Sequence, residues 1–194
     1  MDKNIITQRR ALVSFKRRKV LSTSFDLIPD AVFAIDTLGK VFLWNKSMEV
    51  MTGIAKSEII GKGDYTHALY FYGSRRPMLA DLVLSPDPHY EVKYSSFVRQ
   101  GDTSQIEVYV PEAYSGKGAH VWSKAAALYS KRGELIGAIQ TISDMTPWVE
   151  QHAKLEALNL EFHATNQELA ATNEQLTAIE EELRQQYEDV LEAR

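Results

Sequence analysis

The chain has 194 residues with a hydrophobic content of 44%, which suffices for one domain with a packed core plus appended segments. It contains no cysteine, which excludes a disulfide framework, a thiolate nucleophile and a cysteine-based metal site. No apolar run approaches the ~18 residues of a membrane span and no signal peptide is recognisable, so we expect a cytoplasmic location.

The net charge of -4 is unevenly distributed along the chain. Residues 1–22 hold seven Lys/Arg and one Asp, whereas residues 148–194 hold three Lys/Arg and eleven Asp/Glu. We expect residues 1–21 to form a basic amphipathic helix. Such a helix could bind nucleic acid or an acidic membrane surface, but packing against the domain or the acidic end of the chain is favoured.

The next segments have the pattern of a β-hairpin followed by short helices. A helical lead-in over Ser24–Pro29 precedes two apolar runs, Ala31–Asp36 and Val41–Trp44, that are joined by a turn containing glycine. Two short helices should follow, over residues 45–51 and 56–60, and each is closed by a glycine.

The second half of this region returns to strands. Residues 61–76 are irregular, Pro77 should start a helix that ends near Ser85, and Tyr90–Arg99 is compatible with a strand or a helix. Three strands are then expected at Gln105–Val110, Ala119–Ser130 and Leu135–Ser143. This order predicts an α+β fold in which short helices cover one face of a five-stranded antiparallel sheet, with room for a small ligand between the layers.

A long helix is predicted after Pro147, with apolar residues at every seventh position. The strong row is Trp148, Leu155, Phe162, Leu169, Leu176, Leu183 and Val190. The companion row is weaker and comprises Gln151, Leu158, Thr165, Thr172, Ile179 and Gln186. We expect a parallel homodimeric coiled coil through residues 148–190, whose polar positions make the pairing marginal, as suits a lever that changes its packing.

Residues 22–146 resemble a PAS domain, the sensory module of two-component signalling proteins and sensor histidine kinases. The resemblance rests on PDAVFAIDTLGKVFLWNKSMEVMTG, SEIIGK and GELIGAIQTISDMT, and the final DMT is similar to the DIT signature that closes many PAS domains. It implies a sheet with strand order 2-1-5-4-3. It also implies that the domain senses a ligand, or mediates dimerisation, and passes a signal to a histidine kinase or another response component.

Catalytic chemistry has little support in the sequence. The five histidines are scattered, and neither a nucleophile–base pair nor a kinase motif is present, so we expect a sensory module, although a parent protein could be a histidine kinase. A flavin–thiol adduct needs a cysteine, and a haem would need a buried histidine such as His67 or His89, neither of which lies in a typical buried helix. The sequence therefore implies no particular cofactor, haem and flavin being disfavoured, and no metal.

Three residues ahead of the helix at Pro77 form a candidate anion site. Tyr72, Arg75 and Arg76 place two guanidinium groups beside a helix N-terminus, which suits the carboxylate or phosphate of a small anionic metabolite. The alternative is that the arginines pair with nearby aspartates, Asp64, Asp81 or Asp87.

Residues on two strands are candidates for a cavity wall. Gln140 shares a face with Ala138 and Ile142, and a lone amide on an apolar face needs a partner or a ligand. Trp122 and Lys124 share a face of the preceding strand. These side chains could line a ligand cavity or fill the core.

The junction between the last strand and the long helix is the expected site of signal transmission. Asp144 and Thr146 have short polar side chains that can bond to nearby backbone, and they should brace this corner. We therefore expect a ligand-sensing transducer; the alternatives are a ligand-free dimerisation adaptor and a DNA-binding regulator that uses the basic N-terminus.

Overall fold

The computed structural model describes residues 23–94 and 96–192. The chain divides into two compact units, one that ends at Thr146 and one that begins at Pro147. The basic helix predicted over residues 1–21 lies outside the described residues. Residues 23–26 are helical and lead into the first strand.

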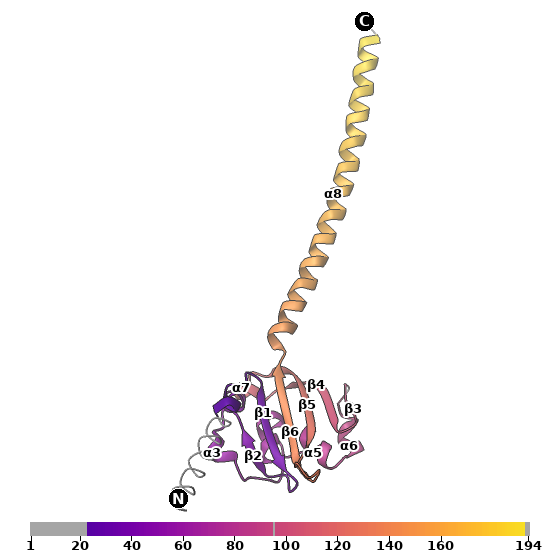
Figure 1. Ribbon diagram of the computed structural model, residues 1–194. Coiled ribbons are helices and arrows are strands. Elements are labelled where there is room, and N and C mark those ends of the chain that lie inside the picture. Colours follow the sequence, from indigo (N-terminus) through magenta and orange to yellow (C-terminus); the bar gives the residue numbers. More distant parts are fainter. Residues whose placement is uncertain (1–22, 95, 193–194) are drawn as a thin grey trace, which may run out of the picture. The chain divides into compact units, whose positions relative to one another are not determined.

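The first unit is built on an antiparallel sheet with strand order β2-β1-β6-β5-β4-β3 (Figure 1). The strands are β1 (Ala31–Asp36), β2 (Val41–Trp44), β3 (Val98–Gln100), β4 (Thr103–Val110), β5 (Ala119–Tyr129) and β6 (Leu135–Asp144). The predicted order of five strands is confirmed, but the number is wrong because the described sheet has six. The ambiguous segment Tyr90–Arg99 contains the end of a short helix and then most of the added edge strand β3.

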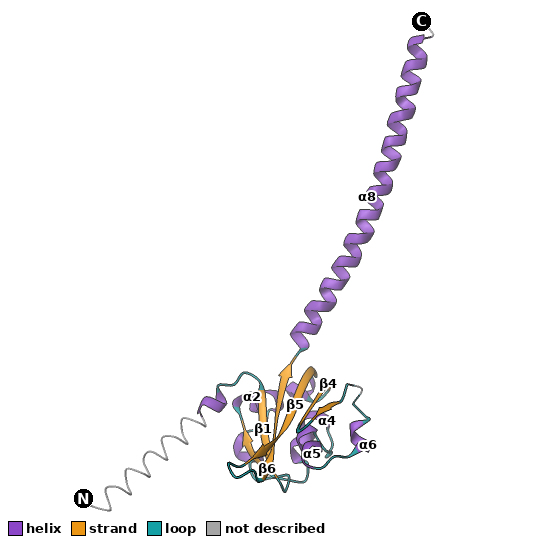
Figure 2. Cartoon of the chain, turned by 45° about the vertical axis from the view of Figure 1, so that its right-hand side comes forward, coloured by secondary structure: helices purple, strands orange, loops and turns teal. Residues whose placement is uncertain are grey.

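Short helices cover one face of this sheet (Figures 1 and 2). They are α2 (Lys46–Thr52), α3 (Lys56–Ile59), the 3-10 helix η1 (Thr66–Ala68), α4 (Leu69–Tyr72), α5 (Leu79–Leu84), α6 (Pro88–Glu91) and α7 (Ala113–Gly116). Asn45 caps α2, since its side-chain oxygen accepts a hydrogen bond from the N–H of Met48 at 3.0 Å. The helix ends at Gly53, which adopts the left-handed conformation that glycine tolerates best.

The hydrophobic core lies between the helices and the sheet. Its largest fully buried side chains come from both layers and include Phe33, Trp44, Met48, Phe71, Leu79 and Leu82. Helix α5 packs across β5 and β6. The centre of the sheet is therefore in contact with the helix that follows the predicted anion site.

The second unit is a single helix, α8 (Thr146–Glu192), of 47 residues. The seam residues Trp148, Leu155, Phe162, Leu169, Leu176 and Leu183 are each more than half exposed, at 54–66%. The predicted long helix is thus present, while its pairing with a second copy stays a prediction. Among the described residues, no helix combines the length and apolar content that crossing a membrane would require.

Candidate functional site

Backbone and side-chain hydrogen bonds hold the corner where β6 ends and α8 begins. The N–H of Met145 donates to the carbonyl of His120 on β5 at 2.7 Å, which extends the sheet by one residue. The hydroxyl oxygen of Thr146 accepts from the N–H of His120 at 2.9 Å, and a carboxylate oxygen of Asp144 accepts from the N–H of Thr146 at 2.8 Å. The first residue of α8 is therefore bonded to β5 as well as to the end of β6.

The carboxylate of Asp144 is ionised at this corner. Partial burial is the largest single influence and opposes ionisation, but the hydrogen bonds from Thr146 and from Tyr114 outweigh it and lower the pKa of Asp144. Burial, together with the neighbouring Asp144, raises the pKa of Tyr114 to about 12, so this hydroxyl stays protonated. Tyr114 is held in place by an unusual backbone, because it and Ser115 both have left-handed φ angles, 53° and 59°.

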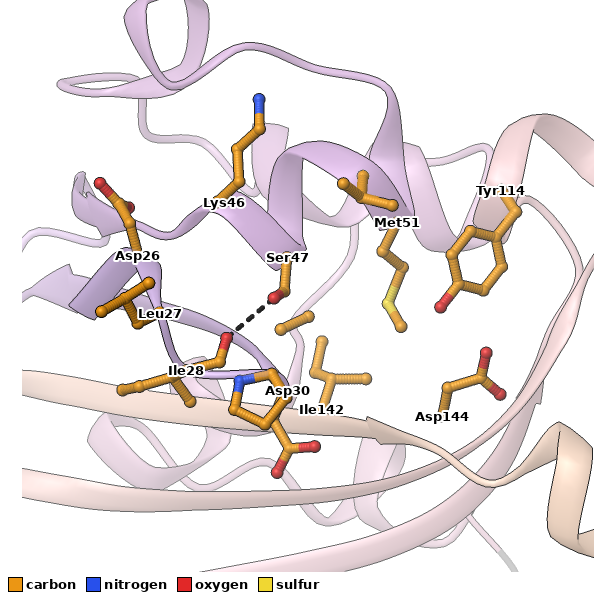
Figure 3. Close-up of a pocket in the computed structure, with 13 residues that line it drawn as sticks. Asp26, Leu27, Ile28, Asp30, Lys46, Ser47, Met51, Tyr114, Ile142 and Asp144 are labelled. Atoms are coloured by element: carbon orange, nitrogen blue, oxygen red, sulfur yellow. Dashed lines mark hydrogen bonds between the residues drawn. The ribbon is translucent and has the colours of Figure 1, made fainter. Parts of the chain in front are cut away.

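A pocket of about 340 Å³ opens beside this corner (Figure 3). Its walls come from the lead-in before β1, from α2, from Tyr114 and from the end of β6. Figure 3 shows the hydroxyl of Tyr114 pointing toward Asp144, with Met51 beside them. The hydroxyl of Ser47 donates to the carbonyl of Ile28 at 2.9 Å and fastens the lead-in to α2.

At the predicted anion site, Arg75 and the N-terminus of α5 bind groups of the protein itself. Arg75 is exposed and pairs with Asp64, as in the alternative considered from the sequence. At the N-terminus of α5, a carboxylate oxygen of Asp81 accepts from the N–H of Met78 at 2.8 Å. The N–H of Ala80 donates to the side chain of Gln140, also at 2.8 Å, so the first turn of this helix is already partnered.

Arg76 lies apart from Arg75 in a group of tyrosines. Its guanidinium lies 4.3 Å from the ring centroid of Tyr72 and 5.2 Å from that of Tyr94, and it donates to the Tyr94 hydroxyl at 2.9 Å. Burial, reinforced by Tyr94, raises the pKa of Tyr72, so that this tyrosine is neutral. The Nε of Arg76 is buried and has no hydrogen-bond partner among the described residues.

Gln140 ties β6 to two other elements in the core. Its side-chain oxygen accepts from Ala80 of α5, and its nitrogen donates to the hydroxyl of Ser123 on β5 at 2.9 Å. The hydroxyl of Ser123 donates in turn to the carbonyl of Thr141 at 3.0 Å. The amide that the sequence left without an evident partner is therefore satisfied at both ends by protein atoms.

Trp122 and Lys124 do not share a cavity with Gln140. In the β5–β6 register Ala125 lies opposite Gln140, and residues directly opposite one another point to the same face of a sheet. Trp122 and Lys124 therefore lie on the other face, where the Lys124 ammonium stacks on the Trp122 ring at 4.1 Å. The interpretation that these three residues line one wall is wrong, because the small Ser123 and Ala125 make room for α5.

The sequence analysis also did not predict a buried pair of side chains, one of which lies on α5. His67, on η1, is fully buried, and its Nε2 lies 2.8 Å from a carboxylate oxygen of Asp81. Its other nitrogen, Nδ1, has no partner in the part of the chain that the structure describes, and neither does the buried hydroxyl of Ser104 on β4. Within residues 23–94 and 96–192, no three His, Cys, Asp or Glu side chains group closely enough to hold a metal ion.

Comparison with known proteins agrees with this architecture. Residues 17–63 match the family model described as the PAS fold. No curated protein matches the sequence.

Solved structures of PAS domains resemble the chain at low sequence identity. The PAS domain of BvgS from Bordetella pertussis is 18% identical, with 74% of this chain and 97% of that chain covered and a TM-score of 0.46. The PAS domain of an HTR-like protein from Haloarcula marismortui is also 18% identical, with coverages of 71% and 98% and a TM-score of 0.48. A PAS domain from Colwellia psychrerythraea is 19% identical, with coverages of 66% and 97% and a TM-score of 0.45. The match of residues 17–63 to the PAS family model, taken with the observed sheet order and the helices on one face, identifies the fold of the first unit as the PAS fold.

Proposed function

We propose that this PAS domain senses a small ligand in its core and passes the change through the corner at Asp144 and Thr146 to a coiled coil formed by α8 and a second copy. The observation that carries this proposal is the hydrogen bonding of Thr146, the first residue of α8, to His120 of the sheet at 2.9 Å. A shift of β6 against β5 would break or reorient this bond. The output would be a histidine kinase or another response component.

Gln140 offers a route from the core to that corner. It lies on β6, four residues before Asp144, and its side chain bonds to α5 and β5. A ligand that competed for the N–H of Ala80 or the hydroxyl of Ser123 would release β6 from one of these elements. Because β6 is paired with β5 as far as Asp144, opposite Val121, a displacement of β6 would reach its last residues.

Buried groups without partners favour a ligand over a filled core. Three buried groups have no partner within residues 23–94 and 96–192, and each such group costs ~1–3 kcal/mol: the Nε of Arg76, the Nδ1 of His67 and the hydroxyl of Ser104. A small anionic metabolite could accept from Arg76 beside the neutral Tyr72. This version of the site leaves out three predicted residues. Arg75 pairs with Asp64, and Trp122 and Lys124 lie on the opposite face of the sheet.

The ligand can be sought by thermal denaturation in the presence of small carboxylates and phosphates. We expect a stabilising compound to raise the melting temperature of the wild-type protein and of Arg75→Lys, but not of Arg76→Lys, which lacks Nε and the planar fork. Equal shifts in both variants would contradict the role of Arg76. A broad screen without any shift would leave the ligand-free dimerisation adaptor as the better description.

Transmission through the corner can be tested with a cysteine reporter, because the chain has no native cysteine. We expect Thr146→Ala to change the rate of disulfide formation between two chains carrying Leu169→Cys, since it removes the bond to His120. The matched control is Thr177→Ala, whose hydroxyl bonds only within α8, to the carbonyl of Asn173 at 2.9 Å. Identical rates in the two variants would show that the corner does not control the seam.

A further inference from the structure

The pocket beside the corner has an apolar lining that is partly uncovered. Leu27 is 77% exposed, Val50 63% and Ile28 37%, and all three face this pocket together with the buried Met51 and Ile142. Clusters of exposed apolar side chains around a depression are typical of binding sites. This lining suits an occupant that brings apolar side chains of its own.

The charge around the pocket is negative. Among the described residues, Asp26, Asp30 and Asp144 line it together with one cation, Lys46, and the ammonium of Lys56 lies 4.0 Å from the Asp26 carboxylate. Lys46 is already neutralised, because its ammonium pairs with Glu49 at 2.8 Å. The pocket is therefore complementary to an apolar segment that carries positive charge.

Such a segment exists in the chain, before the lead-in that forms one wall. We propose that residues 9–19 dock in this pocket of their own chain. Their apolar residues are Leu12, Val13 and Phe15, and their basic residues are Arg9, Arg10, Lys16, Arg17, Arg18 and Lys19. The apolar side chains would cover Leu27 and Val50, while the basic ones would face the aspartates.

The length of the chain permits this docking. Phe15 precedes Asp26 by 11 residues, which can span up to ~36 Å when extended. A short tether also gives a high effective concentration, of the order of mM, so that even weak complementarity fills the site. The same segment on a second chain would have no such advantage.

Docking would place cations next to the carboxylate that braces the corner. Asp144 accepts from the N–H of Thr146 and belongs to the pocket wall. A basic side chain bound to Asp144 would compete with that hydrogen bond. The pocket would then be a second input to the transducer, a consequence that rests on the proposed function, whereas the docking itself does not.

Disulfide trapping tests the docking directly, since every cysteine in the protein would be an introduced one. The test pair is Phe15→Cys with Val50→Cys. The control pair is Phe15→Cys with Val92→Cys, because Val92 is 79% exposed and follows α6, at the other edge of the sheet from α2 (Figures 1 and 2). Both valines are exposed, so neither substitution disturbs the core.

We expect the test pair to form a disulfide within one chain about tenfold faster than the control pair. Asp26→Asn together with Asp30→Asn, or 1 M salt, should reduce this advantage, since the Debye length falls to ~3 Å. Equal rates for the two pairs would overturn the proposal. Cross-links that join two chains, seen as a species of doubled mass, would also overturn it.

The result is independent of ligand sensing and of the coiled coil. If no disulfide is trapped while ligands still stabilise the protein, the docking proposal is contradicted and the proposed function is not. Trapping that succeeds, even if Thr146→Ala leaves the Leu169→Cys rate unchanged, would keep the docking and dismiss only its influence on the seam.

Discussion

The PAS domain and helix α8 differ in how their apolar side chains are covered. In the domain, Phe33, Trp44 and Phe71 are fully buried, whereas in α8 the seam residues Leu155, Leu169 and Leu183 remain more than half exposed. The domain thus has a core of its own, while the seam residues along the 47 residues of α8 are left uncovered by the described part of the chain. The two regions should respond to mutation in different ways, the domain in its melting and the helix in its association.

The largest effect is expected from a charge in the seam of α8. Leu176→Lys should weaken the proposed homodimer by ~3–6 kcal/mol, because each of the two leucines would contribute ~1.5–3 kcal/mol when buried. This corresponds to a rise of more than about 100-fold in the dimer Kd, measured by sedimentation equilibrium.

A matched leucine on the same helix serves as the control. Leu160 is 72% exposed and lies outside both rows of the seam, so Leu160→Lys should leave the dimer intact. If the two substitutions had equal effects, or if the wild-type chain were monomeric at all concentrations, the contrast between domain and helix would need another explanation. Leu160 and Leu176 carry the same change, which removes helix propensity as a cause.

In the domain, the substitution with the largest expected effect is Gln140→Met. It keeps the length of the side chain but leaves the N–H of Ala80 without its acceptor, so we expect the free energy of unfolding to fall by ~1–3 kcal/mol. Chemical denaturation measures this change. Gln105→Met on β4 is the control, since Gln105 lies opposite Lys124, on the face away from the helices, and should change stability by no more than ~0.5 kcal/mol.

The comparison also explains which parts of the fold could be predicted. The hairpin, the strand order and the long helix follow from local periodicity and from resemblance, and each is present. Alternation along β5 indicates two faces but does not say which one the helices cover. Trp122 and Lys124 were considered for the cavity wall, but they lie on the other face, because the covered face needs the small Ser123 and Ala125 to admit α5.

Contacts between residues far apart in the sequence could not be predicted, for a related reason. His67 and Asp81 are 14 residues apart and belong to different helices, and no spacing rule joins them. The pocket beside the corner brings Asp26 together with Asp144, and its wall includes Tyr114. Only the pairing of β6 with β1 and β5 places these residues together.

The smallest expected effect lies at the corner itself, in the dependence of stability on pH. The hydrogen bonds that overcome burial lower the pKa of Asp144 in the folded state, whereas the unfolded chain should titrate near ~3.9. As the pH falls below about 5, the unfolded state therefore takes up a proton before the folded state does. The contribution of Asp144 to stability is fully present above the unfolded pKa and is lost as the pH falls through the folded one.

Asp144→Asn removes this titration. It therefore isolates the contribution of the corner to the pH dependence of stability. At neutral pH we expect it to destabilise the protein by less than ~1 kcal/mol, because the group is only partly buried. Between pH 5 and the end of the acid transition, the difference in unfolding free energy between wild type and Asp144→Asn should shrink towards zero. If the Asp144→Asn difference stayed constant with pH, the carboxylate would not be the group that holds Thr146, and the coupling of β6 to α8 would depend on the bonds to His120 alone.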